Sequence, residues 1–215
     1  MKQKRLEAIC SFLTTEDKII DIGCDHAYVP IYMAKKGATH ILATDIHENA
    51  LNVAKENIQK NHLENTIETL LSDGLDKVDT KNYDTLVLAG MGASTILSIL
   101  DNKEKLEPIK KIIIQSNNDL EKLRQTMMKQ NFTLKEEKIL EEKGHYYAIM
   151  VYQKGLQKLS EEELLLGLYN PHNKNYYNFL KETYSAILKQ SQNEEIKRKL
   201  KLVLNYLYKE NGTIW

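Results

Sequence analysis

Short apolar segments alternate with amphipathic helical segments along the first 130 residues of this chain. Runs such as Ile19-Ile20-Asp21-Ile22 have the length of a buried strand, and segments whose apolar residues recur every three or four positions follow them. A strand–helix–strand unit within one sheet makes its two strands parallel and lays the helix across one face. The alternation therefore predicts an α/β fold, with a parallel sheet covered by helices on both faces.

Hydrophobic periodicity places the individual elements. Helices are expected at residues 2–12, 29–36, 48–61, 94–100 and 120–130, and strands at residues 18–22, 40–45, 67–71, 83–89 and 111–115. Residues 133–140 and 146–152 are both strand-like and have no helix between them, so we expect them to pair as an antiparallel hairpin.

Five parallel strands closed by an antiparallel hairpin are the plan of the class I S-adenosylmethionine (SAM) methyltransferases. We therefore assign residues 1–154 to a Rossmann-like domain of this kind. A dinucleotide-binding Rossmann domain is the alternative. It would carry G-x-G-x-x-G after the first strand, where this chain has Gly23 alone.

The remaining residues, 155–215, have a different character. Ser160 opens a helix with a capping box, and Asn170-Pro171 ends it. Two apolar stripes at three-four spacing follow, one on each side of residues 190–193: Tyr177, Leu180, Tyr184 and Ile187, then Ile196, Leu200, Val203 and Leu207. We expect a helical domain formed by an antiparallel coiled-coil hairpin.

The charge distribution gives this tail a candidate role. The whole chain has a formal net charge of zero, with 30 basic and 30 acidic residues, which argues against a nucleic-acid coat protein. From Lys154 onward there are 10 basic and 7 acidic residues. Two interpretations fit this excess: a solvated helical face, and an RNA-contacting arm that uses Lys197, Arg198 and Lys201.

Several other classes of protein are disfavoured. Cys10 and Cys24 are too few for a disulfide framework and lack the spacing of a zinc site, so no metal is expected. We recognise no signal peptide and no apolar run of membrane-spanning length. We expect a cytoplasmic protein without membrane attachment, and the sequence indicates no protein partner.

Glycine and aspartate residues follow the expected strands at the edge where open parallel sheets bind ligands. Gly23 lets a cofactor approach the backbone, because no side chain blocks the way. Asp45 can accept hydrogen bonds from both hydroxyls of a ribose, and Asp73 can accept one from an adenine amino group. Aspartate at a strand end is also a common turn residue, but three such positions in register favour SAM binding.

The methyl acceptor is expected beside the end of the fourth strand, at Gly90-Met91-Gly92. The chain lacks the Asn/Asp-Pro-Pro-aromatic sequence of enzymes that methylate the exocyclic amino group of adenine. Neither cysteine is placed to serve as the thiolate of a carbon-5 pyrimidine methyltransferase, and Cys24 is better interpreted as a small packed residue.

Three segments resemble the bacterial tRNA (adenine-22-N1)-methyltransferases: D-I-G-C-D-H-A-Y-V-P at residues 21–30, A-G-M-G at residues 89–92 and G-H-Y-Y-A-I-M-V-Y-Q-K-G at residues 144–155. With the helical tail, the resemblance covers essentially the whole chain. It implies a Rossmann-like SAM domain, a C-terminal coiled-coil domain, and N1-methylation of an adenine in the D-arm region of tRNA. Two positions depart from the family pattern, which usually has Gly at Ala93 and often an acidic residue at Ala148.

The same resemblance implies the residues of the site. On the cofactor side these are Arg5, Asp21, Gly23, Asp45, Asp73, Gly74, Ala89 and Gly90, and on the substrate side Tyr28, Met91 and Gly92. Asp25 and His26 are the implied catalytic pair.

Chemistry gives Asp25 its candidate role. Adenine N1 has a free lone pair, so it needs no base before it attacks the methyl group, and positioning supplies most of the rate. A carboxylate near the amino group stabilises the positive charge that develops on the base and can later take a proton. The alternative is that Asp25 caps the following helix. His26 is expected to orient the loop, while Tyr28 either stacks on a flipped base or belongs to the core.

Two other functions stay open at this point. One is a SAM-dependent methyltransferase that acts on ribosomal RNA or a small molecule, although the chain shows no inserted lid over its pocket. The other is a non-catalytic SAM- or RNA-binding module with a dimerising coiled coil. The presence of Asp25 and of the Gly-Met-Gly segment argues against this module.

Overall fold

The computed structural model describes residues 4–116 and 118–209 of the chain. Seven strands form one mixed sheet in the order β3-β2-β1-β4-β5-β7-β6. They are β1 (Ile19–Ile22), β2 (Ile41–Asp45), β3 (Ile67–Leu71), β4 (Thr85–Met91), β5 (Lys111–Ser116), β6 (Phe132–Glu142) and β7 (His145–Lys154). Strands β1 to β5 pair in parallel and β7 is antiparallel to both β5 and β6, so the predicted parallel sheet with a closing hairpin is confirmed.

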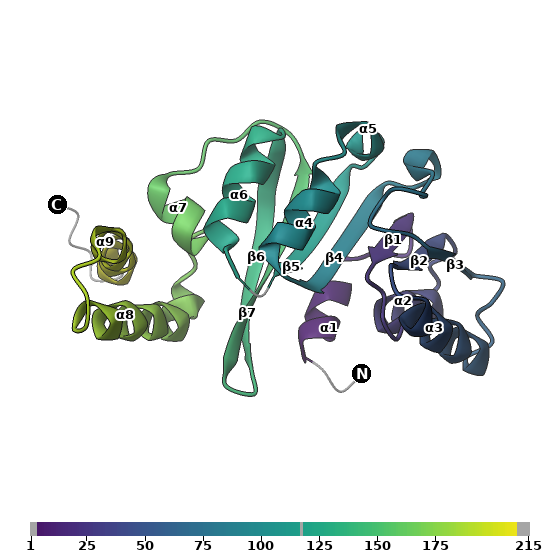
Figure 1. Cartoon of the computed structure of the whole chain (residues 1–215), viewed down its shortest axis with the longest axis horizontal. Helices are drawn as coiled ribbons and strands as arrows, with labels where there is room; N and C mark the ends of the chain where they lie inside the picture. The colour runs from purple at the N-terminus through teal and green to yellow at the C-terminus, as the bar shows by residue number, and fades with distance from the viewer. Residues whose placement is uncertain (1–3, 117, 210–215) are drawn as a thin grey trace.

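Helices cover both faces of this sheet (Figure 1). One face packs against α1 (Lys4–Cys10), α2 (Tyr28–Lys36) and α3 (Glu48–Lys60). The other packs against α4 (Ala93–Leu100), α5 (Lys103–Leu106) and α6 (Leu120–Lys129), and a 3-10 helix, η1 (Thr80–Asn82), precedes β4. Strands buried on both faces need apolar side chains at nearly every position, which explains the continuous apolar runs in the sequence.

The ends of several elements differ from the sequence-based expectations. β4 continues past Ala89 to Met91, across a shift in its register with β5. The hairpin strands are longer than expected, so Lys143 and Gly144 alone form the turn, and both have the positive φ that a tight two-residue hairpin requires, 54° and 77°. The expected start of the first helix at residue 2 lies outside the described residues.

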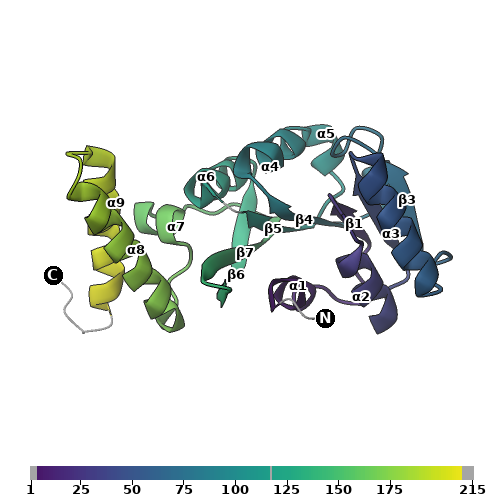
Figure 2. The same cartoon turned by 60° about the horizontal axis from the view of Figure 1, so that its bottom comes forward.

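The tail forms a separate helical layer at one end of the molecule, beyond β6 (Figure 2). It contains α7 (Glu161–Leu166), the 3-10 helix η2 (Pro171–Asn173), α8 (Lys174–Leu188) and α9 (Glu194–Lys209). These helices share an apolar core of their own: Leu165, Leu166, Tyr177, Leu202, Val203 and Tyr206. A C-terminal helical unit is therefore present.

The coiled coil and the domain boundary at residues 154–155 stay predictions. α7 takes part in the helical core, which a simple two-helix coiled coil does not include. Ile187, placed in the first apolar stripe, is 39% exposed. In residues 4–116 and 118–209, no helical segment reaches the length and hydropathy that crossing a membrane takes.

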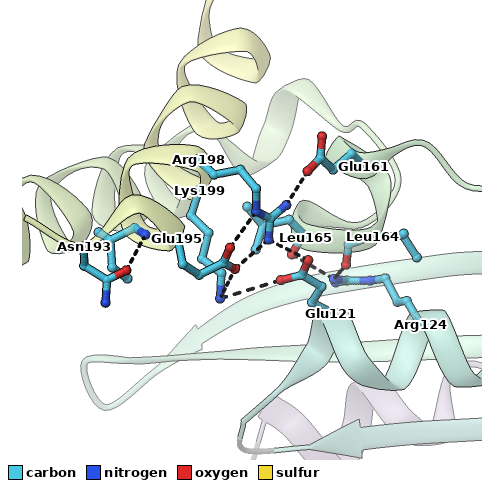
Figure 3. Close-up of polar contacts among 10 residues, drawn as sticks. Glu121, Arg124, Glu161, Leu164, Leu165, Asn193, Glu195, Arg198 and Lys199 are labelled. Carbon is cyan, nitrogen blue, oxygen red and sulfur yellow. Dashed lines mark hydrogen bonds and ion pairs between the residues drawn. The ribbon is translucent and has the colours of Figure 1, made fainter.

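A buried arginine joins the tail to the sheet domain (Figure 3). Arg124 on α6 is completely buried, and its guanidinium donates to the Glu137 carboxylate on β6. The same guanidinium donates to the main-chain oxygens of Leu164 and Leu165 at the end of α7, each at 2.9 Å. Arginine suits this position because its planar fork can reach several acceptors at once. The buried charge is therefore compensated by a carboxylate and two carbonyl groups.

Arg198, which we expected to contact tRNA, takes part in this junction. Its guanidinium lies 2.9 Å from Glu121 on α6, 2.7 Å from Glu161 and 2.7 Å from Glu195 on its own helix. Three carboxylates already occupy its donors, so little capacity remains for a phosphate. Arg198 ties α9 to α6 and to the start of α7 (Figure 3), and its expected contact with tRNA stays a prediction.

We predict that Arg124→Ala lowers the free energy of unfolding by about 3–5 kcal/mol, because the Glu137 carboxylate and two carbonyl groups would lose their buried donor. Lys197→Ala is the control, since it removes an exposed ion pair on α9 in which Lys197 Nζ lies 2.6 Å from Glu194. It should cost about 0–1 kcal/mol. Urea unfolding measures both variants, and equal losses would contradict the structural role of Arg124.

Candidate functional site

A cavity of about 620 Å³ opens at the carboxyl ends of β1, β2 and β4. The strand order reverses between β1 and β4, which makes this the switch point where open α/β sheets bind ligands. Most residues singled out in the sequence line this cavity: Arg5, Asp21, Gly23, Asp25, His26, Tyr28, Asp45, Asp73, Gly74, Ala89, Gly90 and Met91. Strand ends that lie far apart in the sequence are thus brought together.

Gly23 forms the turn that follows β1. Its φ is 72°, and a Cβ at this position would collide with the Met91 side chain of β4. The N–H groups of Gly23 and Cys24 both donate to the Thr44 carbonyl oxygen at 2.9 Å, which holds the loop against β2. Glycine is therefore favoured here for its backbone conformation, since the flexible end of the Met91 side chain could move away from a Cβ.

Asp45 is buried at the end of β2, where its carboxylate organises two loops. One oxygen accepts a hydrogen bond from the His47 N–H at 2.9 Å, and the other accepts one from the Asp25 N–H at 3.2 Å. A carboxylate offers about four acceptor positions, so about two remain for a ligand. This geometry fits a residue that binds the two hydroxyls of a ribose.

Asp21 is buried in the floor of the cavity, with 5% of its surface exposed. Burial, reinforced by the neighbouring Asp45 carboxylate, raises the pKa of Asp21 from 3.8 to about 7. A cation bound nearby would oppose this shift, because it favours the charged form of the carboxyl group. The cavity floor is therefore suited to a positively charged group of a ligand.

Asp25 lies at the rim of the cavity with its backbone in a left-handed conformation, φ 47°. Its side chain is 72% exposed, and one carboxylate oxygen lies 3.8 Å from His26 Nε2. Helix α2 begins at Tyr28 with Ala27 as its N-cap, and no side chain in the described part of the chain caps it there. The geometry therefore does not support the helix-cap alternative for Asp25.

His26 and Tyr28 form a second feature of the rim. Their rings stack with centroids 5.3 Å apart and planes 22° from parallel, and Tyr28 is 45% exposed rather than part of the core. The His26 carbonyl oxygen accepts from the Asn57 side chain at 3.1 Å, which fits an orienting residue. Among the described residues, no three or more His, Cys, Asp or Glu side chains gather around a metal position.

Arg5 on α1 contributes a positive charge to the cavity wall. Its guanidinium lies 5.1 Å from the centre of the Tyr147 ring, within the range of a cation–π contact. Its Nε is buried and has no hydrogen-bond partner among the described residues. Because a buried donor without a partner is costly, this group fits an anionic acceptor on a ligand.

The opposite wall is formed by the end of β4. Gly90, at the register shift, has φ of 79°. Gly92 does not line the cavity; it is the N-cap of α4. Ala93, where the family usually has Gly, is the first residue of α4. Its helical backbone conformation is one that alanine adopts readily. The departure at this position therefore does not disturb the wall.

Sequence reasoning missed several residues of the cavity: Ile46, His47, Ser72, Thr95 and Ile99. Three of them directly follow the ends of β2 and β3, so the strand-end rule that found Asp45 and Asp73 was an available signal. The two residues on α4 face the cavity only because of how that helix packs, which the sequence does not reveal. Lys197, Arg198 and Lys201 in the tail do not line the cavity.

Comparison with known proteins identifies the relatives of this chain. A family model described as a methyltransferase domain matches residues 2–150. The tRNA (adenine(22)-N(1))-methyltransferase of Bacillus subtilis is 32% identical over 154 residues, covering 71% of this chain and 65% of that protein. A putative tRNA methyltransferase of Mycoplasma pneumoniae is 30% identical over 187 residues, covering 80% of this chain and 84% of that protein. The chain belongs to this tRNA methyltransferase family.

A solved structure of this tRNA methyltransferase family has the same architecture. It is a putative tRNA (m1A22) methyltransferase of Streptococcus pneumoniae in complex with S-adenosyl-L-methionine, with a TM-score of 0.89 and 28% identity. The match covers 96% of this chain and 100% of that chain, so it includes the helical tail. The resemblance recognised in the sequence motifs is thereby confirmed.

The pKa of Asp21 predicts how the stability of the free protein depends on pH. Folded Asp21 keeps its proton up to about pH 7, whereas the unfolded chain releases it near pH 4. The contribution of Asp21 to the free energy of unfolding is therefore complete below about pH 4 and falls by about 1.4 kcal/mol per pH unit up to about pH 7. Asp21→Asn removes this loss, so the variant should gain stability relative to wild type as the pH rises.

Urea unfolding of wild type and Asp21→Asn at a series of pH values, without added ligand, measures this difference. Carboxyl groups distant from Asp21 titrate equally in both proteins and cancel in the comparison. A difference that is constant across the series would contradict the raised pKa of Asp21.

Proposed function

We propose that this chain is a SAM-dependent methyltransferase that modifies N1 of adenine 22 in tRNA, in the cytoplasm. The observation that carries the proposal is the position of Asp25. Its backbone N–H is held by Asp45, the expected ribose ligand, while its carboxylate lies at the cavity rim. Asp25 thus connects the two parts of the site: its backbone contacts the residue expected to bind the cofactor, and its side chain lies where the methyl acceptor is expected. The named activity of the Bacillus subtilis relative supports the choice of substrate.

The chemistry of the cavity fits SAM part by part. Asp21 suits a cationic group, the unpartnered Arg5 Nε suits the carboxylate, and Asp45 suits the ribose diol. Asp73, exposed beyond the end of β3, suits the adenine amino group. When bound, SAM supplies a methyl group on a positively charged sulfur, which is the electrophile of the reaction.

Asp25 and Tyr28 would act on the target adenine. The exposed face of Tyr28, backed by the stacked His26 ring, offers a flat surface for a base taken out of its helix. The lone pair of N1 would form a bond to the methyl carbon while its bond to the sulfonium sulfur breaks and leaves a neutral thioether, so the positive charge would move to the adenine. The Asp25 carboxylate stabilises this charge and accepts a proton from the amino group after transfer. The chain therefore contributes mainly positioning and electrostatics.

Methylation of ribosomal RNA or of a small molecule is the competing function. Mass analysis of nucleosides from tRNA and rRNA, with and without this gene, separates the possibilities. Loss of 1-methyladenosine from tRNA, restored by the gene, supports the proposal. Loss of a modified nucleoside from rRNA alone, or from neither RNA, contradicts it.

We predict that Asp45→Ala weakens SAM binding by about 10- to 100-fold, because it removes two charge-assisted hydrogen bonds to the ribose. Asp76→Ala is the matched control, since Asp76 is an exposed carboxylate near the same edge that does not line the cavity. Calorimetry measures both affinities. An affinity of Asp45→Ala equal to that of the control would refute the ribose assignment.

Asp25→Asn should lose methyl transfer while its SAM affinity stays within a few-fold of wild type. The substitution keeps the backbone N–H that contacts Asp45 and removes only the negative charge. Single-turnover methylation of unmodified tRNA, together with calorimetry, separates the two effects. If SAM affinity fell as steeply as turnover, Asp25 would be a cofactor ligand rather than a catalytic residue.

The helical tail, with α8 and α9 as its coiled-coil arm, is proposed to contact tRNA phosphates through Lys197 and Lys201. They lie four residues apart on one face of α9, and both are exposed. Replacing both with Ala should weaken tRNA binding and flatten its salt dependence by about two units of slope. The control is Lys55→Ala with Lys60→Ala on α3, at the opposite end of the molecule (Figure 1). Equal tRNA affinity and salt slope in the two double variants would exclude this contact.

A further inference from the structure

A second cleft, of about 410 Å³, lies between the sheet domain and the tail. Its walls come from the end of β5, from the β6–β7 hairpin and from α8. On the hairpin side Tyr146 and Ala148 line it, and on the tail side Tyr176 and Phe179. The volume falls within the range of about 300–1,000 Å³ that is usual for small-ligand pockets. We call this space the aromatic cleft.

The aromatic rings of the cleft are in contact, yet one of them stays open to solvent. The Tyr146 ring centroid lies 5.3 Å from that of Tyr176 and 5.1 Å from that of Phe179. Phe179 is nevertheless 46% exposed. A ring that served only to pack the hairpin against α8 would be buried, so Phe179 presents an apolar face to whatever enters the cleft.

The charges around the aromatic cleft are balanced. Lys122 and Lys199 line it, and so do Asp119 and Glu121. Lys199 already lies 3.6 Å from Glu121 and 3.5 Å from Glu195. A phosphate site would need an excess of positive charge, whereas a neutral flat group needs aromatic surface with polar groups at its edge.

The aromatic cleft lies directly behind the acceptor wall of the first cavity. Ser116, which lines the cleft, donates through its hydroxyl to the Met91 carbonyl oxygen at 3.2 Å. Asn118, also in its lining, accepts from the Ala93 N–H at 2.9 Å. Met91, which lines the first cavity, is therefore in direct contact with Ser116, which lines the second, so a substrate in the first cavity would have its neighbouring groups near the second.

Resting on the proposed function, we propose that the aromatic cleft binds an unpaired base of the tRNA that adjoins the methylated adenine, stacked on Phe179. A base can react at N1 only after it leaves its helix, and its neighbours then lose a stacking partner. RNA-binding proteins commonly hold such bases on aromatic side chains. Ala148 lies opposite Ser116 in the β5–β7 ladder and lines the cleft. Its small side chain leaves room there for the base.

The test compares Phe179→Ala with Phe179→Trp and with the control Tyr208→Ala, an aromatic residue on α9 that is 57% exposed and lies outside both cavities. Phe179→Ala should weaken tRNA binding by about 5- to 100-fold, the usual range for loss of one stacking ring. Its SAM affinity should match wild type. Phe179→Trp should restore tRNA binding, and Tyr208→Ala should leave it unchanged.

A second readout locates the base. We expect a tRNA carrying 2-aminopurine on one side of the target adenine to change fluorescence on binding wild type and Phe179→Trp but not Phe179→Ala. The inference is overturned if Phe179→Ala binds tRNA as Tyr208→Ala does, or if neither neighbouring reporter depends on the ring at position 179. If wild type methylates no tRNA at all, the proposed function is wrong and this inference is overturned with it. An active wild type with an unaffected Phe179→Ala variant overturns the inference alone.

Discussion

The parallel pairing of β1 with β2 and β4 is the constraint from which the rest of the site follows. Parallel strands in register end at one edge, and here Ile22, Thr44 and Leu88 lie side by side in the ladders. The chain leaving β1 must then turn across the end of β2, where the Thr44 carbonyl oxygen holds the turn. Asp45, the next residue of β2, accepts from the backbone of both its own loop and the β1 loop. The loops that form the cavity are therefore held by hydrogen bonds that continue the pairing of the strands past their ends.

This origin explains which parts of the structure could be predicted from the sequence. Gly23, Asp45 and Asp73 lie at or just beyond the ends of apolar strands, so local pattern and the parallel-sheet rule place them at the same edge. The expected hairpin also needed only local information, because no helix fits between its two strand-like segments. Even there the strand ends were missed, since the positive φ of Lys143 and Gly144 sets a tighter turn than the pattern suggested.

What the sequence did not reveal depends on partners that are distant along the chain. Nothing near Arg198 in the sequence indicates that Glu121 and Glu161 are its acceptors, so the sequence left both a solvated face and an RNA-contacting arm open for the basic cluster. Arg124 was not singled out at all, because an arginine in an amphipathic helix usually faces solvent. Its burial is possible only where β6 supplies a carboxylate and α7 supplies two carbonyl groups. Both arginines thus fix the orientation of the tail on the sheet domain. Their hydrogen bonds are directional, whereas apolar contacts alone would allow several orientations.

The loop that carries Asp25 combines strain with rigid support. Asp25 and Ala27 both have left-handed backbones, φ 47° and 56°, a conformation that costs a residue with a Cβ about 1–2 kcal/mol. The Asp25 N–H to Asp45 and the Ala27 N–H to the Cys24 carbonyl oxygen, at 2.7 Å, hold the loop in this form. The backbone therefore sets the direction of the Asp25 Cα–Cβ bond and places the carboxylate at the rim of the cavity, 3.8 Å from His26 Nε2. The strain at Asp25 is thus the energetic cost of a backbone turn that points this side chain toward the rim of the cavity rather than into the core.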